Sequence, residues 1–187
     1  LTSLVHRGGE RMDEKDLIYD WNIIQHDFTR DESAHPHPIW FDDETLRDGL
    51  QSPSARNPRI EEKIELLDHM ENLGIQKVDL GLPGAGPFHV DHIDAMLSHI
   101  KENDYEIRPG CAVRTVVGDI EPIVDLQAKH EMQIQASAFL GTSPIRQYTE
   151  NWTMDKIIST AEKAITFAVE NDIPVMFITE DTTRSKP

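Results

Sequence analysis

A polar segment that follows a short apolar run holds the residues of this chain best suited to chemistry. The run is Ile39-Trp40-Phe41, and residues 41–53 read FDDETLRDGLQSP. The carboxylate of Asp48 is a hard ligand for Mg²⁺, Mn²⁺ or Zn²⁺, and the guanidinium of Arg47 is a fixed positive fork for a developing oxyanion. The same pair could instead form an ion-paired turn in which Gly49 adopts an unusual backbone angle. The residue types alone leave both interpretations open.

The elements that must position this segment are predicted by the spacing of apolar residues. From Ile39 onward, short apolar runs alternate with longer segments of helical periodicity, which indicates strands alternating with helices. The expected strands are 39–41, 77–82, 106–114, 132–140 and 175–178, and the expected helices are 58–73, 90–100, 120–128 and 153–170. Each expected strand is apolar on both faces, as is typical of a parallel sheet covered by helices.

Five such units could belong to an open doubly wound sheet or to an incomplete (β/α)8 barrel. The turn after the first expected strand has no Gly-rich phosphate fingerprint, whereas polar residues follow strands one, two, four and five. Polar residues at the carboxyl ends of strands are typical of a TIM barrel. We therefore predict the α/β class and a TIM barrel of which about the first five βα units are present, too few to close it. Residues 38–187 would be the N-terminal part of that barrel, and the acidic, aperiodic residues 1–37 an N-terminal arm.

Composition restricts the possible partners. The 187 residues are 38% apolar, enough to bury one core, and 34 acidic against 18 basic residues give a formal charge of -16, which argues against nucleic-acid binding. No apolar run is long enough to span a membrane, and Leu1 to Glu10 lack the apolar core of a secretory signal. We therefore expect a soluble, cytoplasmic protein. The single cysteine, Cys111, is interpreted as a small core residue.

Other histidine and glycine patterns are weaker candidates for a site. His35 and His37 alternate with prolines ahead of the first strand, so we interpret them as unrelated to a metal site. His89 and His92 could share a helix face, but no cysteine or carboxylate framework with zinc spacing accompanies them, which favours a solvated helix start. The glycines of residues 81–86 lack the fingerprint spacing and predict a turn.

Four segments resemble, in order, the family of isopropylmalate, homocitrate and citramalate synthases, which are relatives of hydroxymethylglutaryl-CoA lyase. They read DETLRDGLQSP at 43–53, VDLGLP at 78–83, SAFLGTSPI at 137–145 and TEDTTRS at 179–185. The resemblance covers roughly residues 39–187. It implies a TIM-barrel acyltransferase, usually a homodimer, that condenses acetyl-CoA with a 2-keto acid at a divalent metal ion.

The resemblance also implies roles for particular residues. Arg47 would stabilise the enolate of acetyl-CoA and the keto oxygen, and Asp48 would bind the metal. Gln51 would lie near the substrate, unless it only satisfies the loop backbone. Glu180 would contact the substrate or join the proton-transfer network, unless it pairs with Arg184 four residues on. The metal-binding His-x-His of this family lies on a late strand outside these residues, so the base and the other metal ligands stay unassigned.

Departures from the family pattern bear on the substrate. Ser137 stands where a larger polar residue is frequent, and Ile178 aligns with a wall of the keto-acid pocket. A neutral residue and an apolar one favour 2-ketoisovalerate over 2-oxoglutarate, because a second buried carboxylate would need a cation or several donors. The product would be 2-isopropylmalate, an intermediate of leucine biosynthesis. Asp79, where Glu is frequent, could be a structural acceptor.

Two alternatives remain open at this point. The chain could belong to a lyase that cleaves a hydroxyacyl-CoA, since Leu50 is similar to the residue that such lyases carry. Against this, Ser52-Pro53 and residues 180–185 are more similar to the synthases. The chain could also be a noncatalytic binding protein that keeps the fold, since a fold does not fix a function.

Overall fold

The computed structural model describes residues 4–7, 10–13, 17, 39–53 and 56–186. The chain divides into two compact units, and each is described by itself. The larger unit comprises residues 39–139 and 160–178. The smaller unit holds the described residues before position 38 together with 140–159 and 179–186.

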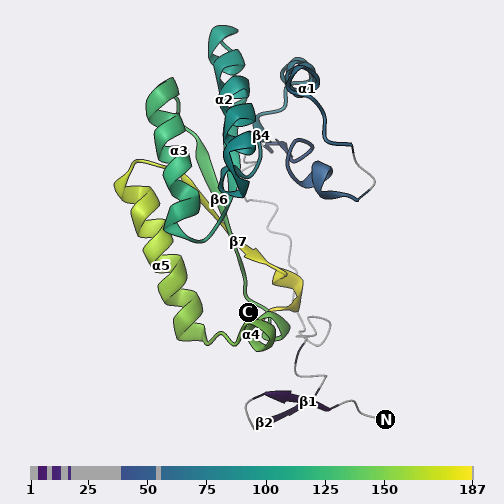
Figure 1. The fold of residues 1–187 in the computed structure, drawn as a ribbon, viewed down its shortest axis with the longest axis vertical. Coiled ribbons are helices and arrows are strands. Elements are labelled where there is room, and N and C mark those ends of the chain that lie inside the picture. Colours follow the sequence, from purple (N-terminus) through teal and green to yellow (C-terminus); the bar gives the residue numbers. More distant parts are fainter. Residues whose placement is uncertain (1–3, 8–9, 14–16, 18–38, 54–55, 187) are drawn as a thin grey trace, which may run out of the picture. The chain divides into compact units, whose positions relative to one another are not determined.

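The larger unit, part of the ribbon in Figure 1, is built on a parallel sheet whose spatial order, β3-β4-β5-β6-β7, is the order of the chain. Its strands are β3 (Asp42–Asp43), β4 (Lys77–Asp79), β5 (Arg108–Arg114), β6 (Gln135–Gly141) and β7 (Val175–Glu180), of which the last residues of β6 and β7 belong to the smaller unit. A doubly wound sheet would place its first strand in the interior, whereas a barrel adds each strand beside the preceding one. The order therefore confirms a partial (β/α)8 barrel with five parallel strands and helices between them.

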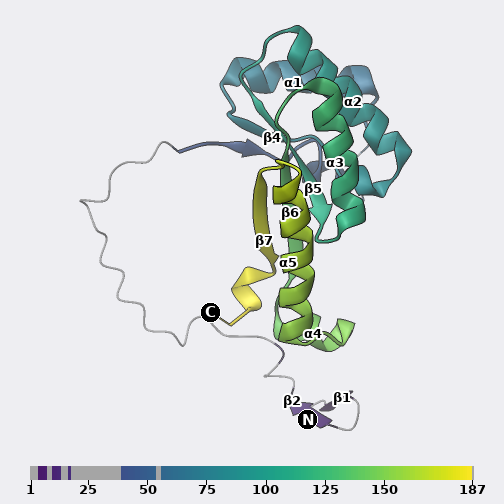
Figure 2. The same ribbon diagram turned by 90° about the vertical axis from the view of Figure 1, so that its left-hand side faces the viewer.

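Four long helices lie between successive strands. They are α1 (Ile60–Leu73), α2 (Pro87–Glu102), α3 (Val117–His130) and α5 (Met154–Glu170). Helices α2 and α3 lie side by side along the sheet (Figure 2). The short 3-10 turn η4 (Pro83–Ala85) joins β4 to α2, where the sequence predicts a turn.

Helix α1 begins two residues later than the Asn-Pro pair suggests. A hydrogen bond from the helix's first turn replaces the expected cap: the carboxylate of Glu62 accepts from the backbone N–H of Arg59, at 2.8 Å. Gly74 ends the helix as predicted, with φ at 73°, a conformation that costs glycine little.

The first strand also differs from the prediction. Ile39 and Phe41 are 83% and 65% exposed, and the paired residues are instead Asp42 and Asp43. Asp42 lies opposite Lys77 and forms an ion pair of 2.8 Å with it. The apolar run was misleading because the pairing here rests on backbone hydrogen bonds and this ion pair rather than on burial of the run.

The core lies between the helices and one face of the sheet. Alternate residues of β4, β5 and β6 join this core, among them Val78, Cys111, Val113, Ala136 and Ala138. Cys111 is fully buried, which confirms its interpretation as a core residue. The residues between them, including Asp79, Ala112 and Ser137, belong to the opposite face, which would be the interior of a complete barrel.

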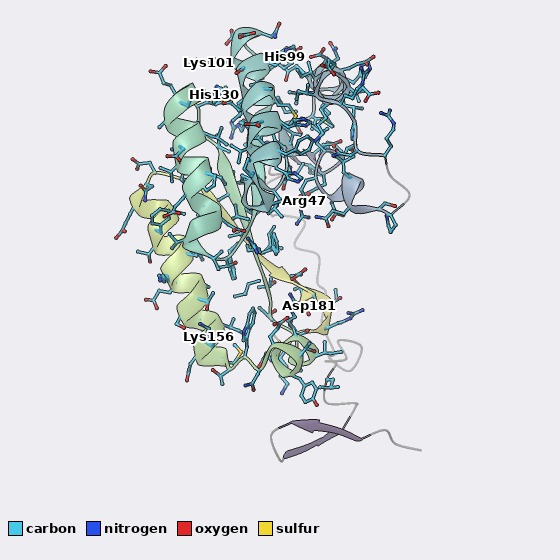
Figure 3. All side chains as sticks on the ribbon, in the orientation of Figure 1. Arg47, His99, Lys101, His130, Lys156 and Asp181 are labelled. Atoms are coloured by element: carbon cyan, nitrogen blue, oxygen red, sulfur yellow. The ribbon has the colours of Figure 1, made fainter. Side chains whose placement is uncertain are left out.

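The smaller unit contains elements that the sequence did not indicate. Strands β1 (Leu4–Arg7) and β2 (Glu10–Asp13) form an antiparallel hairpin in the segment expected to be an arm. Helix α4 (Pro144–Glu150) and the turn η5 (Thr182–Arg184) are joined by Asp181, whose carboxylate accepts from the backbone N–H groups of Thr142 and Ser143 and from the Ser143 hydroxyl (Figure 3). His35 and His37 lie outside the described residues.

In residues 39–53 and 56–186 and the short described stretches before them, no helix is both long and apolar enough to cross a bilayer.

Candidate active site

The candidate site is centred on the turn after β3, which is fixed by its own backbone. The carbonyl of Glu44 accepts hydrogen bonds from the N–H groups of Arg47 and Gly49, at 3.2 and 3.0 Å. Leu46 is buried in the core and anchors the turn. The turn continues into the 3-10 helix η3 (Asp48–Gln51), so Arg47, Asp48 and Gln51 occupy one rigid corner at the carboxyl end of β3.

The side chain of Arg47 contacts three other residues of the site. Its guanidinium carbon lies 5.3 Å from the ring centroid of Phe139 on β6, a cation–π contact. One terminal nitrogen lies 3.2 Å from the Asp48 carboxylate and 3.9 Å from that of Glu44. Its Nε is buried and has no hydrogen-bond partner. Arg47 is therefore positioned by its neighbours while one donor remains available for a ligand.

Asp48 differs from Arg47 in its exposure. The Asp48 side chain is 65% exposed, and Arg47 contacts one of its oxygens. The ion-paired turn considered from the sequence therefore exists, but an ion pair this exposed contributes little stability, and it leaves the other oxygen accessible. Within the part of the chain that the structure describes, no three His, Cys, Asp or Glu side chains gather as a metal shell. Asp48 fits a hard cation as a single ligand.

Asp79, the last residue of β4, adds a buried carboxylate near Arg47. It is 3% exposed, and its Oδ1 accepts hydrogen bonds from the N–H groups of Gly81 and Ala112, at 2.9 and 3.2 Å. Its Oδ2 is buried without a partner. Burial raises the pKa of Asp79 to about 7; the negative charge of Glu44 adds to this rise, and the two hydrogen bonds and Arg47 oppose it. Asp79 can therefore exchange a proton near neutral pH.

Glu44 completes a cluster of polar atoms that lack partners. Its Oε2 is buried without a hydrogen bond, and burial raises the pKa of its carboxyl, against the opposing effect of Arg47. Glu44, Arg47 and Asp79 thus each keep one unsatisfied polar atom. Buried polar groups in folded proteins are normally satisfied, so such a concentration points to a place where a ligand completes the hydrogen bonding.

A cavity of about 280 Å³ adjoins the turn. Its lining includes Arg47 and Gln51 from the turn, Lys63 from α1, and His89 and His92 from the start of α2. Figure 3 shows Arg47 beside this end of α2. Gln51, expected near the substrate, therefore lies on the wall of the same cavity as Arg47.

The other expected site residues lie on later strands. Ser137 on β6 is buried, lies opposite Ala112, and is two residues before Phe139 on the same face of the strand. Ile178 lies on the neighbouring strand β7 and is partly buried. Glu180 ends β7 in the smaller unit, where it is exposed.

Two features of the site were not recognised in the sequence. Asp79 was considered only as a structural acceptor, and Lys63 was not considered, although its place three residues after Ile60 and four before Leu67 puts it on the apolar face of α1. The sequence could have indicated Lys63, because it is a charged residue within an apolar helical stripe. In the structure, Lys63 is buried and lines the cavity.

The five parallel strands in chain order, with a polar corner at the carboxyl end of the first, define a partial (β/α)8 barrel. Residues 37–187 match the family described as HMGL-like, and the chain belongs to that family. The expected resemblance to acyl-CoA synthases and lyases is thereby confirmed at the level of the family.

Individual relatives are similar over most of this chain. The 2-isopropylmalate synthase of Lactococcus lactis subsp. cremoris is 31% identical over 152 residues, which are 80% of this chain and 28% of that protein. The 2-isopropylmalate synthase of Sediminispirochaeta smaragdinae is 27% identical over 81% of this chain and 29% of its own length. Homocitrate synthase AksA of Methanosarcina acetivorans is 26% identical over 80% of this chain and 35% of its own length. The chain thus spans less than a third of the two 2-isopropylmalate synthases.

Proposed function

We propose that this chain carries the part of an acyltransferase site that condenses acetyl-CoA with a 2-keto acid. The observation that carries the proposal is the corner after β3, where the fixed guanidinium of Arg47 keeps an unpartnered donor beside the exposed carboxylate of Asp48. Relatives named 2-isopropylmalate synthase and homocitrate synthase support an acetyl-CoA-condensing class.

In this proposal the chain's residues divide the work of a Claisen condensation. Asp48 would hold a divalent ion such as Zn²⁺, Mn²⁺ or Mg²⁺, whose chemistry when bound is to polarise the keto group. A base removes a proton from the acetyl methyl group, and the resulting enolate carbon attacks the keto carbon. The charge moves to the former keto oxygen, which then takes up a proton. Water cleaves the thioester and releases CoA.

Arg47 would stabilise negative oxygen during this sequence. Its guanidinium is fixed against Phe139, so no reorganisation is needed when the charge develops. Asp79, with a pKa near neutrality, could exchange a proton close to Arg47. We propose Glu180 as a second group of the proton-transfer network. The sequence also suggested an ion pair between Glu180 and Arg184. Among the described residues 179–186 this ion pair is not formed.

We propose 2-ketoisovalerate as the keto acid and 2-isopropylmalate as the product, which would place the reaction in leucine biosynthesis. Ser137 is buried and neutral, and Ile178 is apolar and partly buried. A second carboxylate, as in 2-oxoglutarate, would need a cation or several donors at such a wall. A branched aliphatic side chain needs neither.

The test is release of free CoA from acetyl-CoA by the intact protein, with divalent metal and a panel of 2-ketoisovalerate, pyruvate and 2-oxoglutarate. We expect the highest kcat/KM with 2-ketoisovalerate. Replacing Arg47 with Ala should lower kcat by about 100-fold or more, the scale for loss of one oxyanion donor, because the fixed guanidinium beside the developing negative oxygen is removed. The matched control Arg56→Ala removes an exposed arginine paired with Glu62 and should leave kcat unchanged.

Two results would contradict the proposal. One is the absence of CoA release across the whole keto-acid panel in the presence of metal. The other is cleavage of hydroxymethylglutaryl-CoA to acetyl-CoA and acetoacetate without any condensation, which would assign the site to a lyase.

A further inference from the structure

Lys63 is a buried cation for which the described residues provide no anion. Its side chain is 4% exposed, on the face of α1 that also buries Leu67 and Met70. Among the described residues it has neither a hydrogen bond nor an ion pair. Burial lowers the pKa of its amine. Because an unpaired buried charge is costly, such a lysine is expected to meet a counter-charge that the described chain does not supply.

His92 provides a second unsatisfied group at the same cavity. Its Nδ1 is buried and has no hydrogen-bond partner, and Lys63 is close enough to help burial lower the pKa of the imidazole. His89, one turn earlier on α2, and Asn57 line the cavity as well. The four side chains, contributed by two helices and the preceding loop, can all donate hydrogen bonds.

The lining also shows a contrast with the whole chain. The sequence has 34 acidic residues and a formal charge of -16, yet no aspartate or glutamate is among the described residues that line this cavity. Its remaining walls include Leu46, Leu80 and Leu82. Apolar walls lower the local dielectric and so strengthen the attraction between a cation and a bound anion. The amino-terminal end of α2 adds a further positive potential.

We infer that this cavity is an oxyanion-binding pocket in which the Lys63 ammonium pairs with a carboxylate or phosphate group and His92 donates to it. The pocket itself follows from the burial and lining of these residues. Its place in the reaction rests on the proposed function, which offers two sources of such an anion: the carboxylate of the keto acid and the phosphates of the acyl-CoA. Either would secure one end of a substrate whose reacting atoms lie at Arg47, on the wall of the same cavity.

The test is equilibrium binding by calorimetry with the intact protein and three probes: inorganic phosphate, CoA and 2-ketoisovalerate. Lys63→Met keeps the length of the side chain and removes its charge, and it should weaken phosphate binding by about tenfold or more. It should also raise the thermal midpoint, because an unpaired buried charge is gone. Lys156→Met, at an exposed position in the smaller unit, is the control and should change neither quantity.

The probes identify the source of the anion. Weaker binding of CoA with unchanged binding of 2-ketoisovalerate assigns the pocket to a phosphate of the acyl carrier, and the opposite pattern assigns it to the keto-acid carboxylate. His92→Leu provides a second variant should Lys63→Met not fold, with the same expected direction. The inference is overturned if the unaltered protein binds none of the probes, or if both variants bind all of them within twofold of it. Binding can be measured without turnover, so the two proposals can fail separately. If the protein binds phosphate through Lys63 but releases no CoA, the synthase function is refuted and the oxyanion-binding pocket is supported.

Discussion

Asp79 shows how a site residue acquires its properties from distant parts of the chain. Its type and its place after an apolar strand can be read from the sequence, as can those of Arg47 and Asp48. Its proton affinity cannot be read in this way, because burial raises its pKa while groups such as the N–H of Ala112, 33 residues later, oppose the rise. The sequence therefore predicted the members of the β3 corner but not the ionisation of the carboxylate beside it.

The raised pKa of Asp79 predicts a pH dependence of stability. The folded state binds this proton more tightly than the unfolded chain, whose pKa is near 3.8. The resulting stability is complete below pH 4 and is lost as the pH rises to about 7. Asp79→Asn keeps an acceptor for Gly81 and Ala112 and removes the titration. Between pH 5 and 7, the free energy of unfolding of the unaltered protein should fall relative to this variant by about 1 kcal/mol per pH unit.

Urea denaturation at several pH values measures this difference. Asp125→Asn, at an exposed position of α3, is the control and should follow the unaltered protein at every pH. Parallel pH profiles for Asp79→Asn and the unaltered protein would show that Asp79 titrates normally.

At the scale of elements, hydrophobic periodicity predicted the existence of the strands and helices better than their ends. All four long helices and strands β4 to β7 were expected, whereas the first strand was expected at residues 39–41, just before β3. The start of α1 was missed because the hydrogen bond from the Arg59 N–H to the Glu62 carboxylate depends on side-chain geometry. Helix α4 was missed because it is only seven residues long and starts at a Ser143 cap, too short for a periodic pattern.

The packing of η4 against α3 gives a prediction at this scale. A Cβ on Gly84 would lie 2.5 Å from the Cγ of Asp119. That carboxylate is buried and accepts hydrogen bonds from the backbone N–H, Nε and Nη2 of Arg114, at 3.1, 2.7 and 2.7 Å, so it cannot yield without loss. Gly84→Ala should therefore destabilise the protein by about 1–3 kcal/mol, measured by urea denaturation.

Gly118→Ala is the matched control for this substitution. The nearest atom to its added Cβ lies 4.0 Å away, at the start of α3. Alanine forms helices better than glycine does. The free energy of unfolding of this variant should therefore equal that of the unaltered protein or exceed it by up to about 1 kcal/mol. Equal stability of the Gly84→Ala variant and the unaltered protein would show that η4 and α3 are packed less tightly than described.

At the scale of the whole molecule, the order of the strands carries the most information. The alternating apolar runs were compatible with both a doubly wound sheet and a barrel. The sequential parallel order of β3 to β7 identifies the fold as a barrel. The family follows from the match over residues 37–187. The metal shell could not be derived in the same way, because a cation needs several ligands brought together and Asp48 is the one expected among the described residues.

Asp48, at the corner after β3, is the residue that we propose as a ligand of the divalent metal. The most direct measurement is titration of the metal-free intact protein with Zn²⁺, Mn²⁺ and Mg²⁺, comparing it with Asp48→Ala and with the exposed control Asp125→Ala. We predict that Asp48→Ala raises the Kd of the preferred metal by at least about tenfold, while Asp125→Ala leaves it unchanged. An unchanged Kd in Asp48→Ala would contradict metal binding by Asp48 and favour the alternative that Arg47 and Asp48 only form an ion-paired turn.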